Sequence, residues 1–255
     1  RNLETEDLRP ILRRGFEDFY ARPTNVIFLS ILYPLAALIL LWAAFGYDLR
    51  HLGFPLVSGF ALVSPIAATG IFEVSRRRER GLDDRLPHVL KGVLQAPSLR
   101  GLLTMGLVLA ALFLLWLWTA LTLYDLFFGP EPPSKMPKFL HAVLTTHEGL
   151  ELLLVGCGTG FVFAGLVFAI SVVSLPMLLD KQVSAIEAIG VSLRVCRKNP
   201  KAMTEWAMIV AVGLVLGTLP LFIGLAVALP VLGHATWHLY RRVVAFEEPE
   251  RPTPL

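Results

Sequence analysis

Long apolar segments almost free of charged residues make up most of this sequence. Six of them are long enough to be candidates for membrane-spanning helices: residues 24–45, 54–72, 101–124, 152–179, 202–218 and 220–240. An α-helix needs about 20 mostly apolar residues to cross a bilayer core. Only 17 % of the 255 residues are charged, against about 25 % in a typical soluble domain, and 55 % are hydrophobic. The sequence therefore predicts an all-α, polytopic membrane protein with six transmembrane helices.

The last two segments could be read as one, because residues 206–237 contain no Asp, Glu, Lys or Arg. A single straight helix of that length would extend about 48 Å, whereas the bilayer core is about 30 Å thick. Residues 217–220, Gly-Thr-Leu-Pro, form a turn signal in the middle. We therefore expect two short spans, 202–218 and 220–240.

The basic residues fall almost entirely on one side of these six segments. This arrangement places 20 of the 23 Lys and Arg residues on one face and leaves three on the other, namely Arg50, Lys135 and Lys138. Cytoplasmic loops carry the excess of Lys and Arg in membrane proteins. Both termini are therefore predicted to be cytoplasmic, with a transmembrane domain at 24–240 and a cytoplasmic tail at 241–255.

Short amphipathic helices are expected beside the spans. In residues 1–23, Leu8, Ile11 and Phe19 recur at helical spacing, which favours an interfacial helix at the membrane surface. Two linkers, 84–95 and 184–197, show the same character. Because basic residues surround them, both are predicted to lie along the cytoplasmic membrane face.

The second linker carries the clearer local signal. Ser184 and Glu187 have the spacing of a capping box, and Ile186, Ile189 and Leu193 follow as an apolar stripe. An equivalent stripe in the first linker consists of Leu86, Val89 and Val93, at a constant offset of about 100 residues. An internal repeat would explain this match. A general likeness between amphipathic linkers would explain it equally well.

Basic and aromatic residues at the ends of the spans are the candidate contacts with lipid headgroups. Basic side chains near an anionic leaflet are attracted to it, and aromatic rings settle at the membrane interface. The expected partner is thus a lipid bilayer that includes anionic headgroups. Nucleic acid is excluded, since the basic residues flank apolar spans. The predicted interface residues are Arg76, Arg77, Arg78, Arg194, Arg197, Lys198, Trp237, Tyr240, Arg241 and Arg242.

No pattern of catalytic residues is present. The sequence has no glycine-rich phosphate loop after a strand, no CxxC, no HExxH and no GxSxG. No acidic or basic residue lies in the middle of a span, where it would indicate an ion or proton pathway. We therefore expect a protein that is not an enzyme and has no cofactor.

One pair of histidines merits a separate hypothesis. His234 and His238 are four residues apart, so they share a helical face and are candidate metal ligands. A tetrahedral metal site needs more ligands than this segment offers. The alternative is that both rings form hydrogen bonds at the cytoplasmic interface, beside Trp237 and Tyr240.

Two runs of sequence resemble a known family. They are SLPMLLDKQVSAIEAIGVSLRVCRKNPKAM, starting at Ser174, and GHATWHLYRR, starting at Gly233. They are similar to an uncharacterised bacterial family of six-span inner-membrane proteins that carry a domain of unknown function. Members are often labelled as similar to cytochrome c oxidase subunit I. The resemblance implies a multi-pass protein of the bacterial cell inner membrane and leaves its activity open.

Three functions are compatible with these observations. The first is an accessory, assembly or scaffold component of a membrane complex, with other membrane proteins, such as a respiratory complex, as partners. The second is a channel or carrier for a small neutral or lipid-like solute. The third is a haem- or metal-binding protein that uses His234 and His238. For the second, hydroxyl groups would line a polar path, and the candidates are Ser58, Ser64, Thr69, Thr159 and Ser171.

Overall fold

The all-α prediction is confirmed over the part of the chain that the structure describes. The computed structural model describes residues 2–21, 53–129, 136–219 and 223–244, together with Leu35, Leu38, Ile39 and Trp42. Every regular element in these residues is a helix. The first predicted span, 24–45, lies outside the described residues apart from those four positions, and so does the tail from residue 245 onward.

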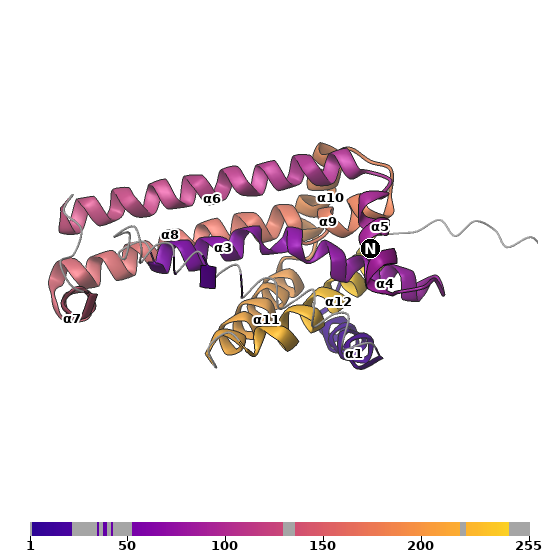
Figure 1. The fold of residues 1–255 in the computed structure, drawn as a ribbon, viewed down its shortest axis with the longest axis horizontal. Helices are drawn as coiled ribbons and strands as arrows, with labels where there is room; N and C mark the ends of the chain where they lie inside the picture. Colours follow the sequence, from indigo (N-terminus) through magenta and orange to yellow (C-terminus); the bar gives the residue numbers. More distant parts are fainter. Residues whose placement is uncertain are drawn as a thin grey trace, which may run out of the picture.

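Two long apolar helices lie side by side through the length of the molecule. Helix α6 (Leu99–Phe128) and helix α8 (His147–Ser171) pack against each other along the longest axis (Figure 1). Helix α9 (Ser174–Asp180) continues almost directly from α8. Among the described residues, three helical stretches are long and apolar enough to cross a membrane: Leu99–Phe128, His147–Asp180 and Pro200–Thr218.

The second predicted span, 54–72, is divided between two helices. A single residue, Ala68, separates helix α3 (Gly53–Ala67) from helix α4 (Thr69–Glu79). Pro65 lies inside α3, and a proline has no N–H to donate within a helix. The Thr69 hydroxyl donates to the Ile66 carbonyl at 2.7 Å. Helix α4 then continues past residue 72 and includes Arg76, Arg77 and Arg78, which the sequence suggested would flank the span.

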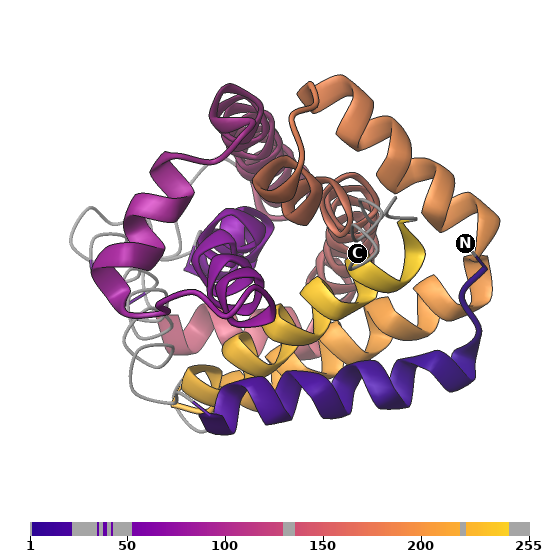
Figure 2. The ribbon, with the colours of Figure 1, turned by 90° about the vertical axis from the view of Figure 1, so that its right-hand side faces the viewer.

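The final apolar stretch forms two helices, as predicted. Helix α11 (Pro200–Thr218) and helix α12 (Leu225–Val243) pack against each other and run obliquely to α6 and α8 (Figures 1 and 2). Their contact is close because glycine faces glycine. A Cβ atom added at Gly224 would lie 2.9 Å from the Cα atom of Gly217. Helix α12 in turn packs along α1 (Thr5–Ala21).

Helices that run across the bundle gather at one end. Figure 2 looks onto that end, where α1 and α10 (Ala185–Lys198) are seen lengthwise while α6 and α8 are seen end-on. Helix α5 (Leu86–Leu94) lies at the same end. The helices predicted at 84–95 and 184–197 are thus confirmed as helices, and the Ser184–Glu187 capping box is present in full.

The buried face of α10 differs from the predicted stripe. Its buried residues are Ala185, Ala188 and Ser192, whereas Ile186 is 83 % exposed. The small side chains allow α10 to approach α8 and α9, so they take the inner positions. Ile189 and Leu193 are half-buried beside them.

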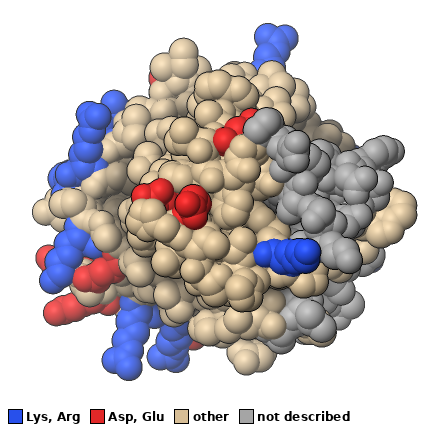
Figure 3. Space-filling model, turned by 90° about the vertical axis from the view of Figure 1, so that its left-hand side faces the viewer, with Lys and Arg blue, Asp and Glu red and all other residues tan. Residues whose placement is uncertain are grey.

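The opposite end carries helix α7 (Met136–Thr145), which packs against α8. Figure 3 looks onto this end of the molecule. Most of the surface seen there is uncharged, and the Lys and Arg side chains stand mainly toward the left and lower edge. Along the sides, α6 exposes large apolar side chains, as expected of a lipid-facing helix. They include Leu103, Leu107, Leu114 and Trp118.

Candidate functional site

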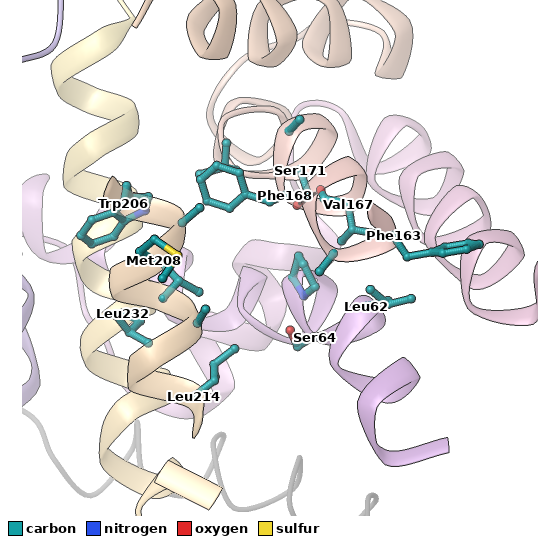
Figure 4. A pocket seen from close by; sticks show the side chains of 18 of the residues that line it. Leu62, Ser64, Phe163, Val167, Phe168, Ser171, Trp206, Met208, Leu214 and Leu232 are labelled. Carbon is teal, nitrogen blue, oxygen red and sulfur yellow. Dashed lines mark hydrogen bonds between the residues drawn. The ribbon is translucent and has the colours of Figure 1, made fainter. Parts of the chain in front are cut away.

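A cavity of about 760 Å³ lies between α8 and the α11–α12 pair. Helices α3 and α4 close another side, and Figure 4 shows side chains from these elements around the space. The volume falls within the range of about 300–1,000 Å³ that is typical of ligand pockets. This cavity is the candidate functional site.

Small residues on α8 leave the space open. Gly156 and Gly165 line the cavity, and a Cβ atom added at either would meet nothing within 4 Å. On the other side, α11 is held to α12 by the contact between Gly217 and Gly224. Glycines in a membrane helix commonly allow a neighbouring helix to pack closely. At these two positions they border the cavity instead.

The lining offers few polar groups to a ligand. Ser171 and Thr236 belong to it, but their hydroxyls donate to the carbonyls of Val167 and Leu232 in their own helices, at 2.6 and 2.7 Å. Ser64 also lines the cavity and has a polar partner of its own, and the exposed Thr204 is the remaining hydroxyl among the described lining residues. A cavity lined in this way suits an apolar ligand rather than an ion.

Two of the other hydroxyls predicted to line a polar path are not at this cavity. Thr69 and Thr159 lie outside the lining, and Thr159 donates to the Val155 carbonyl in its own helix. The side chain of Ser58 is outside the described residues. The polar path envisaged from the sequence is therefore not formed by these residues as a set.

Trp206 differs from Ser171 and Thr236, whose polar groups bond within their own helices. Its side chain is fully buried, and its indole Nε1 has no hydrogen-bond partner in the described part of the chain. Figure 4 places it on the same side of the cavity as Met208 and Leu232. A buried donor without a partner costs about 1–3 kcal/mol. An acceptor on a bound molecule would remove that cost.

Both cysteines of the chain also line the cavity. Cys157 is exposed, and Cys196 is half-buried with its Sγ 4.0 Å from the Ala169 carbonyl oxygen. Burial raises the pKa of the Cys196 thiol to about 11. The side chain is therefore protonated near neutral pH and is a poor nucleophile.

The histidine pair lies elsewhere, between α1, α4 and α12. His238 Nε2 is 3.0 Å from the Asp18 carboxylate, and His234 Nδ1 is 2.6 Å from the Ser75 hydroxyl. His234 is fully buried, and its Nε2 atom has no partner among the described residues. Within the same residues no group of three or more His, Cys, Asp or Glu is placed to hold a metal ion. A metal role for the pair stays a prediction.

Asp18 is the centre of this polar contact. Ser75 donates to its carboxylate at 3.1 Å, and the Arg78 guanidinium lies 2.9 Å from the other carboxylate oxygen. Burial alone would raise the pKa of Asp18. The hydrogen bond from His238 and the charges of His234, His238 and Arg78 outweigh burial, so the pKa is lowered.

Further buried charges join the same helices. Glu73 is fully buried and accepts from Arg76 at 2.6 Å and from Arg77 at 3.1 Å. Asp180 pairs with Arg80 at 2.6 Å and accepts from the Tyr240 hydroxyl at 3.0 Å. We call the residues that link α1, α4, α9 and α12 the polar joint: Asp18, Glu73, Ser75, Arg76, Arg77, Arg78, Glu79, Arg80, Asp180, His234, Trp237, His238, Tyr240 and Arg241.

The predicted interface residues thus divide into two groups. The first makes contacts within the protein. Trp237 and Tyr240 are buried, Trp237 donates to Glu79, Arg241 pairs with Glu79, and Arg242 pairs with Asp7. The arginines at 76–78 belong to the polar joint. The second group, Arg194, Arg197 and Lys198, is exposed and makes no ion pair or hydrogen bond within the described ranges.

Sequence reasoning missed the cavity and the polar joint. One expectation placed His234 at the cytoplasmic interface, and no sequence pattern singled out Glu73 or Asp180, yet all three are buried. The glycine content of α8 is a local signal for the cavity, but it does not distinguish close helix packing from open space.

Comparisons with known proteins give one match. A family model described as "Predicted integral membrane protein (DUF2189)" matches residues 53–180, which is half of the chain. This stretch contains α3 to α9. No curated protein matches, and no solved structure matches.

Proposed function

Because the chain belongs to the DUF2189 family of predicted integral membrane proteins, we propose that it binds a lipid-like molecule in the cavity between α8 and the α11–α12 pair. The observation that carries this proposal is the cavity itself, with its size and its apolar lining. A hydrocarbon chain placed there would meet side chains such as Leu62, Phe168 and Leu214, which are its preferred surroundings. The protein acts as a carrier or holder of this solute.

The lining argues against a channel for polar solutes. Conduction of a polar solute needs groups that replace its hydration. The hydroxyls of Ser171 and Thr236 are engaged by their own helices. Of the two kinds of solute in the channel-or-carrier hypothesis, the cavity therefore supports the lipid-like one.

The role is proposed to be non-enzymatic. Burial raises the pKa of the Cys196 thiol and so keeps it in its protonated form. Asp18 and His238 resemble an acid–base pair, but they contact each other where α1 packs against α12. They lie outside the cavity lining.

The proposed topology is six spans with both termini cytoplasmic in the bacterial inner membrane. The concentration of Lys and Arg on one side supports it. The amphipathic helices α1 and α10 lie across the end that would face the cytoplasm (Figure 2). The linker helices α5 and α10 would then be the matching parts of an internal repeat.

An accessory or scaffold role is a second candidate. The apolar side chains that α6 exposes along its length would contact either lipid or another membrane protein. Such a partner would cover Leu107 and Trp118, which lie outside the cavity lining. The two roles are compatible with each other.

The test is retention of lipid by the purified protein. We would purify the chain in a mild detergent and measure bound lipid by native mass spectrometry and by extraction. Gly165→Phe places a ring at the cavity wall and is expected to reduce bound lipid strongly. Gly158→Phe is the matched control, because Gly158 lies on the same helix, also has open space, and is not in the lining. Equal lipid content in the two variants would refute the proposal.

A further inference from the structure

Three exposed basic residues lie close to cavity-lining positions in the sequence, at the junction of α10 and α11. Arg197, Lys198 and Lys201, here called the junction cations, stand where α10 ends and α11 begins. All three are exposed and make no ion pair or hydrogen bond with any part of the chain that is described. The arginines of the polar joint, by contrast, are paired with carboxylates. The junction cations are thus available to an anion.

Their positions alternate with the cavity lining. Cys196, Pro200 and Thr204 line the cavity, while Arg197 and Lys201 directly follow the first two of them. Lys201 precedes Thr204 by three residues, so these two positions share a face of α11. An anion bound by the junction cations would therefore lie at the entrance to the apolar space.

The start of α11 also favours an anion. Asn199 is the N-cap residue, but its side chain makes no capping bond. Its Oδ1 accepts from the Leu3 backbone and its Nδ2 donates to Val195, at 2.7 and 3.0 Å. The positive end of the helix dipole is consequently left without a side-chain cap beside the junction cations.

Trp206 provides the second, independent observation. Trp206 lines the cavity five residues beyond Lys201, which is about 7.5 Å further along the helix, and its buried Nε1 has no partner in the described part of the chain. A ligand that enters past the junction cations would thus meet positive charge first, a hydrogen-bond donor next and an apolar space last. Its own groups should follow the order anion, acceptor and hydrocarbon.

We infer that the ligand of this cavity is an anionic phospholipid, with its phosphate at the junction cations and an acyl-ester carbonyl accepting a hydrogen bond from Trp206. This inference rests on the proposed function and names the ligand class. A free phosphate would leave the apolar space unfilled. A neutral diacylglycerol would leave the junction cations without a partner.

The test is a lipid titration of the delipidated protein in mild detergent, followed by native mass spectrometry. The probes are phosphatidylglycerol, phosphatidylcholine and diacylglycerol with identical acyl chains, and glycerol phosphate without chains. Phosphatidylglycerol should bind at least fivefold more tightly than the other probes, since one basic residue near an anionic headgroup contributes about that factor.

Two substitutions locate the binding groups. Lys201→Gln should weaken phosphatidylglycerol binding about fivefold and leave diacylglycerol binding unchanged. Lys91→Gln on α5 is the matched control, because Lys91 is also exposed but belongs to a helix that contributes no residue to the cavity lining, whereas α11 contributes several. Trp206→Phe should weaken the binding of all three lipids by about two- to twelvefold. Its control is Trp237→Phe, since Trp237 donates to Glu79 and does not line the cavity.

The outcomes separate this inference from the proposed function. Equal affinity for the three lipids, abolished by Gly165→Phe, would overturn the inference and keep the lipid-binding proposal. Glycerol phosphate that binds as tightly as phosphatidylglycerol would overturn it as well, and so would equal losses from Lys201→Gln and Lys91→Gln. If Gly165→Phe changes no lipid affinity, the proposed function itself fails. The lysine variants keep the test decisive if Trp206→Phe does not fold.

Discussion

His238 Nε2 on α12 lies 3.0 Å from the Asp18 carboxylate on α1, although 220 residues separate them in the sequence. This contact, with the pair between Arg242 and Asp7, fixes the first helix along the last. Ser75 and Arg78 add α4 to the same carboxylate. The helix at the start of the chain is therefore part of the folded bundle, and its apolar face is covered by α12.

Asp18→Asn should loosen this attachment. The substitution keeps the shape of the side chain but removes the charge that Arg78 and His238 contact, and hydrogen bonds to charged groups contribute about 1.5–3 kcal/mol. We expect a loss of free energy of unfolding of that size, measured by thermal unfolding in detergent. Glu17→Gln is the control, because Glu17 pairs with Arg13 on the exposed face and should change stability by less than about 0.5 kcal/mol. An equal effect of both substitutions would contradict the role of Asp18.

The same contact should weaken in acid. The pKa of Asp18 is lowered in the folded protein, so folding favours its carboxylate form. The resulting stability is complete above the unfolded pKa, near 3.8, and is lost as the pH falls through the folded pKa. Protease cleavage near the end of α1 should accordingly increase below about pH 4 in the wild type. Asp18→Asn should lack this increase. A pH profile that is identical in the two proteins would count against the assignment.

Glu73 should be among the residues most sensitive to substitution. It is fully buried, and both Arg76 and Arg77 donate to it. Glu73→Gln leaves two guanidinium groups without a counter-charge, and breaking a buried ion pair in this way costs about 3–5 kcal/mol. Thermal unfolding in detergent would measure the loss. Glu151→Gln, at a half-exposed pair with His147, is the comparison and should have little effect.

The features that could be predicted from the sequence depend on neighbouring residues. The end of a helix just after Gly217 and the cap formed by Ser184 and Glu187 are set by local chemistry, and both are present, since α11 ends at Thr218. The cavity depends on how far α11 stands from α8, which no single segment encodes. The burial of Glu73 and Asp180 likewise results from helices that are distant in the sequence. No local sequence pattern marks either residue for burial.

Cys196 should react slowly with thiol reagents near neutral pH. Its pKa of about 11 leaves roughly one thiol in a thousand ionised at pH 8, and the thiolate is the reactive form. In a Cys157→Ser background, which isolates Cys196, the labelling rate should rise about tenfold per pH unit between pH 8 and 10. Mass spectrometry of the labelled protein would follow it. A rate already at its maximum at pH 8 would show that the thiol is not held in a buried, protonated form.

The proposed orientation predicts where reporters become active. Arg76, Arg80 and Arg197 belong to the end where α1, α5 and α10 lie, whereas the α7 end is mostly uncharged (Figures 2 and 3). Because Lys and Arg near span ends stay in the cytoplasm, the α7 end should face the periplasm. A reporter that is active only in the periplasm should work when inserted within 130–137 and remain silent when fused after residue 255. A cytoplasm-only reporter at the same two sites is the control and should give the reverse pattern. Periplasmic activity from the fusion after residue 255, with silence at 130–137, would invert the topology and place the junction cations on the outer face.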